Sequence, residues 1–359
     1  MGLEERSTNQ GAKLGTSSRL RNSLLLFLLA LIVAGSIFYY LYFTWYQPYK
    51  SFPEKQKFLL IDKGTPSYQI SQSLEREGIV RHWYWFLAYL KVMRRSAHLQ
   101  AGEYLFEQPI SIAHVADKLI RGQVYYHEVT IPEGYSLFEI AELLQQKGLI
   151  ASDDFLQAAR QVNKISDLVP LKENLEGYLF PDTYRLTRGT RAEEFVGMMT
   201  SKFREIYARK LELPLKQSPY GLDEIMIMAS LIEKETAVDG ERPLVAAVYY
   251  NRLKRKMPLQ CDPTVIYAAK LKGEYRGKIF QSDLDLDSPY NTYVRLGLPP
   301  APIANPGIRS IEAAMSPANV DYLYFVSNNN GGHVFSKTLE EHQKAVASYR
   351  SERARKPHS

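Results

Sequence analysis

Two glutamates stand near the end of a strongly apolar segment, in the stretch SLIEKETAVDGER at residues 230–242. On a helical wheel with about 100° per residue, Glu235 falls in the middle of the apolar stripe and Glu233 falls about 160° away. An apolar environment favours the neutral form of a carboxyl group and so raises its pKa. A carboxylic acid that keeps its proton near neutral pH can donate it to a leaving oxygen, as cleavage of a glycosidic bond requires. Glu235 is therefore the first candidate for a general acid, and Glu233 is the second.

A structural role is the alternative for Glu235. The pattern predicts a helix over residues 221–238 with Asp223 as its N-cap, so Glu235 lies near the helix end, where it can pair with Arg242 or Arg252 or reach solvent. A second helix is predicted over 241–253, with Arg252 and its neighbour Asn251 off the apolar face.

The segments that follow carry side chains suited to a sugar-binding groove, because sugar rings stack on aromatic rings and sugar hydroxyls pair with amides and carboxylates. Gln260, Asp262, Asn291 and Tyr293 are of these types. The last two lie in the stretch 288–307, which holds five prolines and two glycines. A loop of this length is usually functional or disordered, and its tyrosines and asparagine favour an ordered binding loop. Polar turn residues without a ligand are the alternative reading.

The chain offers little for metal or thiol chemistry. Its seven histidines do not fall at ligand spacing, and its single cysteine excludes a CxxC metal site. No metal and no cofactor is predicted. A cysteine hydrolase built from Cys261, His333 and Asp262 is a rival interpretation, although a lone cysteine is more often a small buried residue.

The N-terminal region contains a membrane-spanning pattern. Residues 24–46 carry no charge, and about 20 apolar residues suffice to cross a bilayer as a helix. The run is longer than the apolar region of a cleaved signal peptide and ends in aromatic residues, which favours an uncleaved anchor. A short N-terminal tail before a large body favours a cytoplasmic N-terminus. The chain has 359 residues and a net charge of +6, with no basic block dense enough to predict a nucleic-acid partner.

An internal duplication occupies the region after the anchor. The stretch LIDKGTPSYQISQSLEREGIV, from Leu60, matches TIPEGYSLFEIAELLQQKGLI, from Thr130, at an offset of 70. Each copy predicts a strand, a glycine turn and an amphipathic helix that ends at a glycine, Gly78 or Gly148, before a second helix. Strand and helix signals alternate irregularly, so the fold class is α+β. The repeated unit is either a spacer or a glycan binder.

A series of short blocks downstream then carries a resemblance: SLIEKET, VYYNRL, LQCDPTVIY, YNTY, GLPP, YLYFV and GGHVF. In order and spacing they resemble the endolytic murein transglycosylases, the MltG/YceG-like family of bacterial inner-membrane enzymes. One departure is Cys261, where threonine is expected. The resemblance implies that Glu235 is the essential acid and base, with Glu233 as the second candidate. The positions it implies for the substrate groove are Asn251, Arg252, Gln260, Asp262, Asn291, Tyr293 and His333.

The resemblance also implies an organisation and a reaction. The expected parts are a cytoplasmic tail (1–22), a transmembrane helix (23–46), a LysM-like region (47–126), a YceG-like catalytic domain (127–345, with 127–160 repeating the earlier unit) and a basic, unfolded tail (346–359). The expected enzyme cuts peptidoglycan strands between N-acetylmuramic acid and N-acetylglucosamine, leaves 1,6-anhydro ends, and lies in the periplasm beside peptidoglycan synthases. Asp262 and Glu241 are candidates for an assisting carboxylate. The alternative is a membrane-anchored wall-binding scaffold without catalysis.

Overall fold

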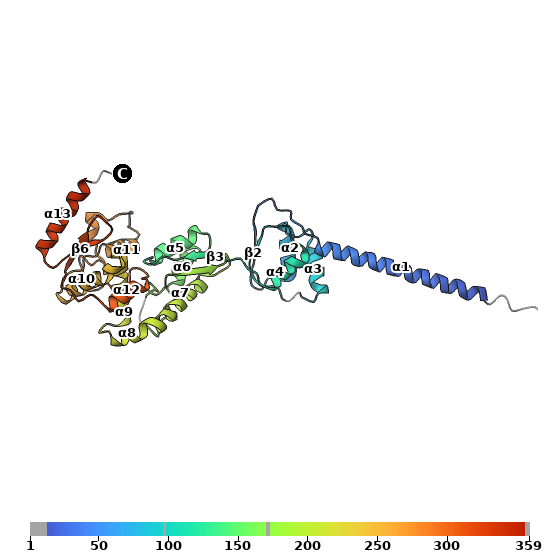
Figure 1. Cartoon of the computed structure of the whole chain (residues 1–359), viewed down its shortest axis with the longest axis horizontal. Coiled ribbons are helices and arrows are strands. Elements are labelled where there is room, and N and C mark those ends of the chain that lie inside the picture. The colour runs from blue at the N-terminus through green and yellow to red at the C-terminus, as the bar shows by residue number, and fades with distance from the viewer. Residues whose placement is uncertain (1–12, 96–97, 170–172, 356–359) are drawn as a thin grey trace, which may run out of the picture. The chain divides into compact units, whose positions relative to one another are not determined.

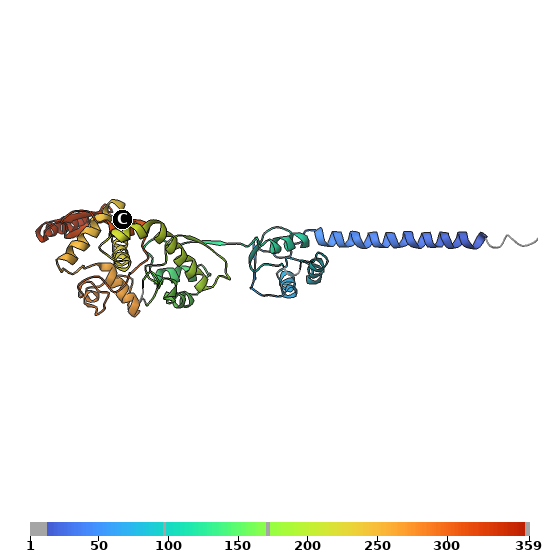
Figure 2. The ribbon, with the colours of Figure 1, turned by 90° about the horizontal axis from the view of Figure 1, so that it is seen from below.

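The structure is a computed structural model that describes residues 13–95, 98–169 and 173–355. The chain divides into two compact units, and the division falls between Tyr126 and His127. Figures 1 and 2 both show the first helix, α1 (Lys13–Tyr46), as one continuous helix. Its segment Leu20–Tyr46 is long and apolar enough to cross a membrane, which is consistent with a membrane anchor.

The first unit continues with a strand, two helices, a second strand and a further helix. The elements are β1 (Lys57–Ile61), α2 (Ser67–Arg76), α3 (Trp83–Val92), β2 (Gly102–Phe106) and α4 (Ile112–Ile120). Strands β1 and β2 are antiparallel, with Lys57 opposite Phe106 and Ile61 opposite Gly102. Helix α2 packs against β1 and α3, and α3 packs against α4, so that the buried apolar residues of the unit form a core of their own.

The second unit opens with the same order of elements. These are β3 (His127–Thr130), α5 (Leu137–Gln146), α6 (Ser152–Ala158) and β4 (Thr183–Leu186), with β3 and β4 again antiparallel. Helices α2 and α5 stand at the offset of 70 seen in the sequence. Gly78 and Gly148 follow them with φ of 70° and 63°, a left-handed conformation in which glycine ends a helix without strain. The LysM-like identity of residues 47–126 stays a prediction.

The rest of the second unit is a helical body with a small hairpin. Its elements are α7 (Ala192–Ile206), a π-helical turn (Tyr207–Leu211), α8 (Glu212–Gln217), α9 (Leu222–Glu235), α10 (Arg242–Lys254), α11 (Asp262–Lys272), α12 (Ile308–Met315), β5 (Tyr324–Ser327), β6 (His333–Ser336) and α13 (Leu339–Arg355). Short 3-10 turns occupy Val162–Lys164, Asp239–Glu241 and Gln281–Asp285. Helix α9 packs against α10, α11 and α12, and its residues from Ile225 to Ile232 are all buried. The described chain is thus α+β, as predicted.

Two details of the predicted elements are wrong. The helix predicted over 221–238 ends at Glu235, and its N-cap is Gly221, whose N–H donates to Glu224. Asp223 instead accepts a hydrogen bond from the hydroxyl of Tyr178. The basic tail is helical through Arg355 as part of α13, and residues 356–359 of that tail lie outside the described residues.

Candidate active site

Glu235 is the last residue of α9, and its position follows from how that helix ends. The preceding turns are buried in the core, and Thr236 then turns to extended backbone with φ of −138°. The carboxylate is therefore carried by a rigid, buried helix but stands where the core stops. Half-buried Glu235 lines a cavity of about 330 Å³. The other described residues that line this cavity are Arg252, Leu259, Gln260, Asp262, Tyr293, Phe325, Val326, Ser327, His333 and His342.

The electrostatic surroundings of Glu235 favour its protonated form. Burial raises the pKa of the Glu235 carboxyl, and the negative charge of Asp262 raises it further. Hydrogen bonds from Cys261 and from Tyr249 oppose this effect, as does the nearby His333. The Tyr249 hydroxyl on α10 donates to Glu235 Oε1 at 2.8 Å. The carboxyl group can thus hold a proton and yet has donors that stabilise its anion once the proton has left.

Asp262 and Tyr293 form a second polar group at the same cavity. Asp262 is the first residue of α11, and Tyr293 lies in the loop 288–307; its hydroxyl donates to Asp262 Oδ1. Gln260 precedes them with φ of 51°, a left-handed conformation uncommon outside glycine. Its N–H donates to the carbonyl of Thr292 at 3.1 Å, which joins the two segments. Strained backbone of this kind clusters at functional sites.

His333 and Glu241 form the third polar group. His333 Nδ1 lies 2.7 Å from Glu241 Oε2, and the His333 N–H donates to Oε1 of the same carboxylate at 2.8 Å. Thr236 also donates to Glu241, at 3.2 Å. Burial would raise the pKa of Glu241, but the hydrogen bonds from His333 outweigh it and lower the pKa. Because Nδ1 faces Glu241, Nε2 is the ring nitrogen of His333 that remains for other contacts.

Arg252 lines the cavity, but its N–H groups donate to backbone carbonyls. Its side chain donates to the carbonyls of Leu323 at 2.7 Å and Leu259 at 2.9 Å, and its guanidinium lies over the ring of Tyr324. Arg252 is 8% exposed. The prediction that it lies off the buried face of its helix is wrong, because these carbonyls draw the guanidinium inward. Its contacts hold one wall of the cavity in place.

Three predicted site residues, Asn251, Asn291 and Glu233, lie outside this cavity. Asn251 donates to the carbonyls of Val320 and Tyr322, and fully buried Asn291 donates to those of Leu284 and Leu286. Both amides therefore hold loops together and do not face a groove.

Glu233 is bound on the other side of α9. Its side chain is 6% exposed and pairs with Arg242 at 3.1 Å, while the N–H of Gly307 donates to its second oxygen at 2.9 Å. These donors bind both carboxylate oxygens of Glu233 in a closed cluster. The wheel places the two glutamates about 160° apart, and in the structure only Glu235 lines the cavity.

The thiol of Cys261 does not fit the rival cysteine hydrolase. It is fully buried, and burial beside Glu235 raises its pKa well above the usual range, whereas a nucleophilic cysteine needs a lowered pKa. The imidazole that would activate it, His333, is turned to Glu241. Cys261 acts instead as a donor close to the Glu235 carboxyl.

Sequence reasoning missed Tyr249 as a partner of Glu235 and did not pair Glu241 with His333. Tyr249 lies 14 residues after Glu235 on a different helix, and Glu241 and His333 are 92 residues apart. No local pattern specifies which side chain a buried hydroxyl will meet.

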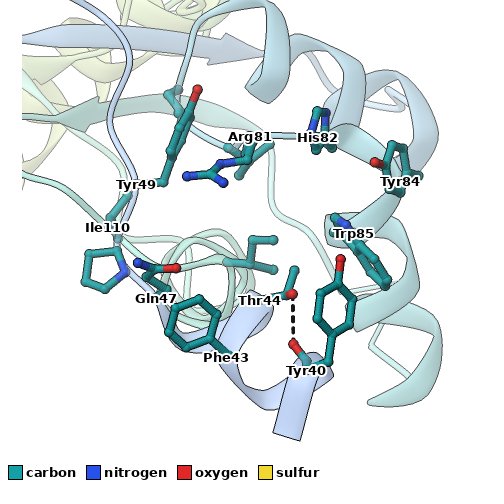
Figure 3. A pocket seen from close by; sticks show the side chains of 14 residues that line it. Tyr40, Phe43, Thr44, Gln47, Tyr49, Arg81, His82, Tyr84, Trp85 and Ile110 are labelled. Carbon is teal, nitrogen blue, oxygen red and sulfur yellow. Dashed lines mark hydrogen bonds between the residues drawn. The ribbon is translucent and has the colours of Figure 1, made fainter. Parts of the chain in front are cut away.

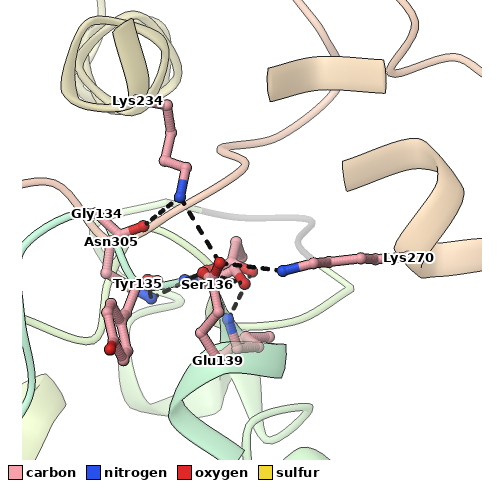
Figure 4. Close-up of polar contacts among 9 residues, drawn as sticks. Gly134, Tyr135, Ser136, Glu139, Lys234, Lys270 and Asn305 are labelled. Carbon is pink, nitrogen blue, oxygen red and sulfur yellow. Dashed lines mark hydrogen bonds and ion pairs between the residues drawn. The ribbon is translucent and has the colours of Figure 1, made fainter. Parts of the chain in front are cut away.

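The repeated unit of the second domain contacts α9 through Lys234. Lys234, between the two glutamates, donates to the carbonyl of Gly134 at 3.2 Å and lies 3.7 Å from Glu139 of α5. Lys270 of α11 reaches the same carboxylate at 3.0 Å (Figure 4). The helices that carry Glu235 and Asp262 are thus tied to one carboxylate on α5.

Comparisons with known proteins agree with this architecture. The model of the YceG-like family matches residues 59–348. The protein named endolytic murein transglycosylase in Bacillus subtilis is 36% identical, over 82% of this chain and 85% of that protein. Its namesake in Streptococcus pneumoniae is 31% identical, over 89% of this chain and 63% of that longer protein. A crystal structure of a YceG-like protein from Listeria monocytogenes superposes with a TM-score of 0.55 at 33% identity, over 81% of this chain and 99% of that one. This chain belongs to the YceG-like family.

Proposed function

We propose that this protein is an endolytic peptidoglycan lytic transglycosylase. It would cut the bond between N-acetylmuramic acid and N-acetylglucosamine within nascent strands, leave 1,6-anhydro-N-acetylmuramoyl ends, and so limit strand elongation. The observation that carries the proposal is the carboxyl of Glu235. It is desolvated, bonded to Tyr249 and placed at a polar cavity, in a chain whose relatives carry this activity in their names.

In the proposed reaction Glu235 protonates the glycosidic oxygen as the bond from that oxygen to C1 of the muramoyl residue breaks. The Glu235 carboxylate then takes the proton of the C6 hydroxyl of the same muramoyl residue, and O6 forms the new bond to C1. No water is consumed, and the enzyme ends with its proton restored. Hydrogen bonds from Tyr249 and Cys261 stabilise the anion between the two steps.

The other polar groups of the cavity would orient the sugar. The ring of Tyr293 offers a stacking face, and its bond to Asp262 fixes the angle of that ring. His333, held by Glu241, offers Nε2 to a sugar hydroxyl or acetamido group. Positioning of this kind brings the C6 hydroxyl near C1, and orientation of reacting groups is a large part of catalysis.

We also propose the organisation that this task needs. Helix α1 would be a single-pass anchor in the cytoplasmic membrane with its N-terminus inside and both folded units outside, in the periplasm. Residues 47–126 would act as a LysM-like module that holds or spaces the strand. Peptidoglycan synthases would be neighbours, because a strand that is still being made is cut beside the enzyme that makes it.

Incubation of the whole chain in detergent with uncrosslinked peptidoglycan strands tests the reaction, with mass spectrometry to identify the new ends. We expect anhydro ends from the wild type and from Glu312→Gln, a matched change at an exposed position on α12. Glu235→Gln should form none while keeping the fold and strand binding. Hydrated reducing ends would show hydrolysis, and unaltered cleavage by Glu235→Gln would remove the assigned acid. Strands bound but never cut would favour the scaffold alternative.

A further inference from the structure

The first unit contains a cavity that the proposed reaction does not use. It measures about 250 Å³ and lies where the last turns of α1 meet the segment that leads into α3. Figure 3 shows the Arg81 guanidinium beside the ring of Tyr49, across the pocket from Tyr40 and Thr44 of α1. Trp85 of α3 completes the aromatic wall.

The end of α1 is built into this unit. Trp45 is 8% exposed and packs edge-on against Tyr89 with ring centroids 5.4 Å apart. Tyr40 packs against Trp85 in the same way at 5.8 Å. The pocket therefore has a fixed place along the axis of α1.

With α1 as the proposed anchor, that place falls at the headgroup level of the bilayer. The charge-free run begins at Leu24, and a hydrocarbon core of about 30 Å takes about 20 residues at 1.5 Å each, so it would end near Phe43. Tyr40, Phe43, Thr44 and Gln47 line the pocket at this depth. Tyrosine and tryptophan are the side chains that membrane interfaces favour.

The charge in the pocket is positive and unbalanced. None of its 14 lining residues, all within the described chain, is an aspartate or a glutamate. Arg81 is exposed and lies over the Tyr49 ring at 5.3 Å; no acidic side chain of the described residues pairs with it. Tyr49 is held by a bridge to Ile110, with hydrogen bonds of 3.0 and 3.1 Å in the two directions. By contrast, His82 beside Arg81 already has Glu75 at 3.5 Å.

We propose that this pocket binds the phosphate of an anionic phospholipid headgroup from the leaflet in which α1 ends. Arg81 would hold the phosphate through its fork of N–H donors, and the Tyr40 hydroxyl lies across the pocket from it. The Thr44 hydroxyl already donates to the Tyr40 carbonyl at 2.8 Å and shapes the wall of the pocket. The acyl chains would run along the apolar surface of α1. Such a lipid would fix the tilt of the first unit against the membrane. The proposal depends on the proposed anchoring by α1 and is independent of the proposed cleavage chemistry.

Intrinsic fluorescence provides a local readout, because the three tryptophans of the chain are Trp45, Trp83 and Trp85. The whole chain in detergent is titrated with dihexanoyl phosphatidylglycerol, and separately with dihexanoyl phosphatidylcholine and inorganic phosphate. We expect a saturable change with phosphatidylglycerol that weakens as salt is raised. Arg81→Gln should weaken this binding about tenfold. Arg121→Gln, in which an exposed arginine that pairs with Asp117 is changed, should bind as the wild type does.

Equal affinity for the two lipids, or wild-type binding by Arg81→Gln, would overturn the proposal. So would inorganic phosphate that binds as tightly as the lipid, because the site would then take a free anion. Should Arg81→Gln fail to fold by circular dichroism, the salt dependence of the wild type decides, and binding indifferent to salt would rule out a charged contact. Carbonate extraction of membranes tests the anchoring separately, and strand cleavage by Arg81→Gln should equal that of the wild type.

Discussion

Glu235 is the one carboxyl group of α9 that is both desolvated and open to the cavity. Its neighbours toward the N-terminus, from Ile225 to Ile232, are buried, and the chain after it leaves the helix. A general acid for a sugar bond needs this combination, because desolvation holds the proton and the cavity admits the leaving oxygen. The side chain of Glu233, two residues earlier, is only 6% exposed and is paired with Arg242.

The raised pKa of Glu235 predicts a dependence of stability on pH. An unfolded glutamate has a pKa of about 4.3, and folding raises that of Glu235 above this value. The folded state therefore binds the proton more tightly, and its stability falls as pH rises from the unfolded pKa to the folded one. Glutamine has no proton to lose. Glu235→Gln should be more stable than the wild type above this window and equal to it near pH 4.

Denaturant titrations across this pH range measure the effect. Glu312→Gln, at an exposed position, should show no such trend. A Glu235→Gln variant that is less stable than the wild type at neutral pH would contradict a desolvated Glu235.

The Tyr249 hydroxyl predicts a shift in the pH profile of activity. Tyr249→Phe removes a donor that stabilises the Glu235 anion, so the pKa of Glu235 should rise further. The alkaline limb of kcat/KM should move to higher pH, with a fall in kcat of about tenfold or more from the lost stabilisation of the anion. Rates of anhydro-end formation across pH give this profile. A lower kcat with an unchanged alkaline limb of the pH profile would mean that Tyr249 acts through packing alone.

Helical spacing placed Glu235 in the apolar stripe and Glu233 away from it, but the resemblance to the family was needed to prefer Glu235 as the acid, and that role stays a prediction. The sequence also predicted Gln260, Asp262, Tyr293 and His333, which the cavity brings together. It did not predict that Asn251 and Asn291 face backbone carbonyls. An amide suits a sugar hydroxyl and a buried carbonyl equally well, and only the folded chain shows which one it meets.

At the scale of elements, the long loop 288–307 is held in place by a buried asparagine. Asn305 is fully buried, and its carbonyl oxygen accepts from the N–H groups of Gly177 and Leu179 at 2.9 and 3.0 Å. Its amide nitrogen donates to Glu176 and to the carbonyl of Tyr135, both at 2.9 Å. The proline-rich stretch that carries Tyr293 is thereby tied to the repeated unit of this domain.

Asn305→Asp is expected to loosen this loop. The change replaces two donors by a carboxylate oxygen that faces Glu176, itself buried, with a pKa raised by burial to about 8. The free energy of unfolding should fall by about 3 kcal/mol or more, because the introduced carboxylate is a buried charge without a cationic partner. The loss should be smaller at low pH, where a protonated carboxyl supplies one donor again. Chemical denaturation measures it, with exposed Asn163→Asp as the control. Equal losses of unfolding free energy in the two variants would mean that the hydrogen bonds of Asn305 do not stabilise the loop.

The duplicated pattern predicted the elements well because each copy repeats its own local signals, an apolar face and a terminal glycine. The starts and ends of other helices were less predictable. Helix α9 ends at Glu235 although Thr236, Ala237 and Val238 extend an acceptable helical pattern. Local hydrogen bonds replace the helical ones after Glu235: the Thr236 hydroxyl donates to Glu241 and accepts from the N–H of Val238. The same limit explains the tail, where α13 continues because β5 and β6 pack against it.

At the scale of the whole molecule, helix α1 is part of the first unit as well as a candidate membrane anchor. Leu41 packs against the core of that unit, and Trp45 belongs to it. The sequence predicted the span from its lack of charge. It did not predict the second role, because a tryptophan at a membrane interface and a tryptophan in a protein core cannot be told apart by sequence. Removal of the anchor at its apparent end therefore takes core residues away.

This double role predicts how truncated chains will behave. A chain that begins at residue 47 loses Trp45, and removal of a buried tryptophan lowers stability by about 3–5 kcal/mol. A chain that begins at residue 39 keeps the packing of Trp45 on Tyr89 and should unfold its first unit at a distinctly higher temperature. Scanning calorimetry separates the two units, and the transition of the second unit, His127 onward, should be the same in both chains. Phe43→Ser in the longer chain, at an exposed position, controls for the effect of the additional exposed apolar residues at its N-terminus. First-unit transitions at equal temperatures would mean that α1 only tethers the protein and adds nothing to its fold.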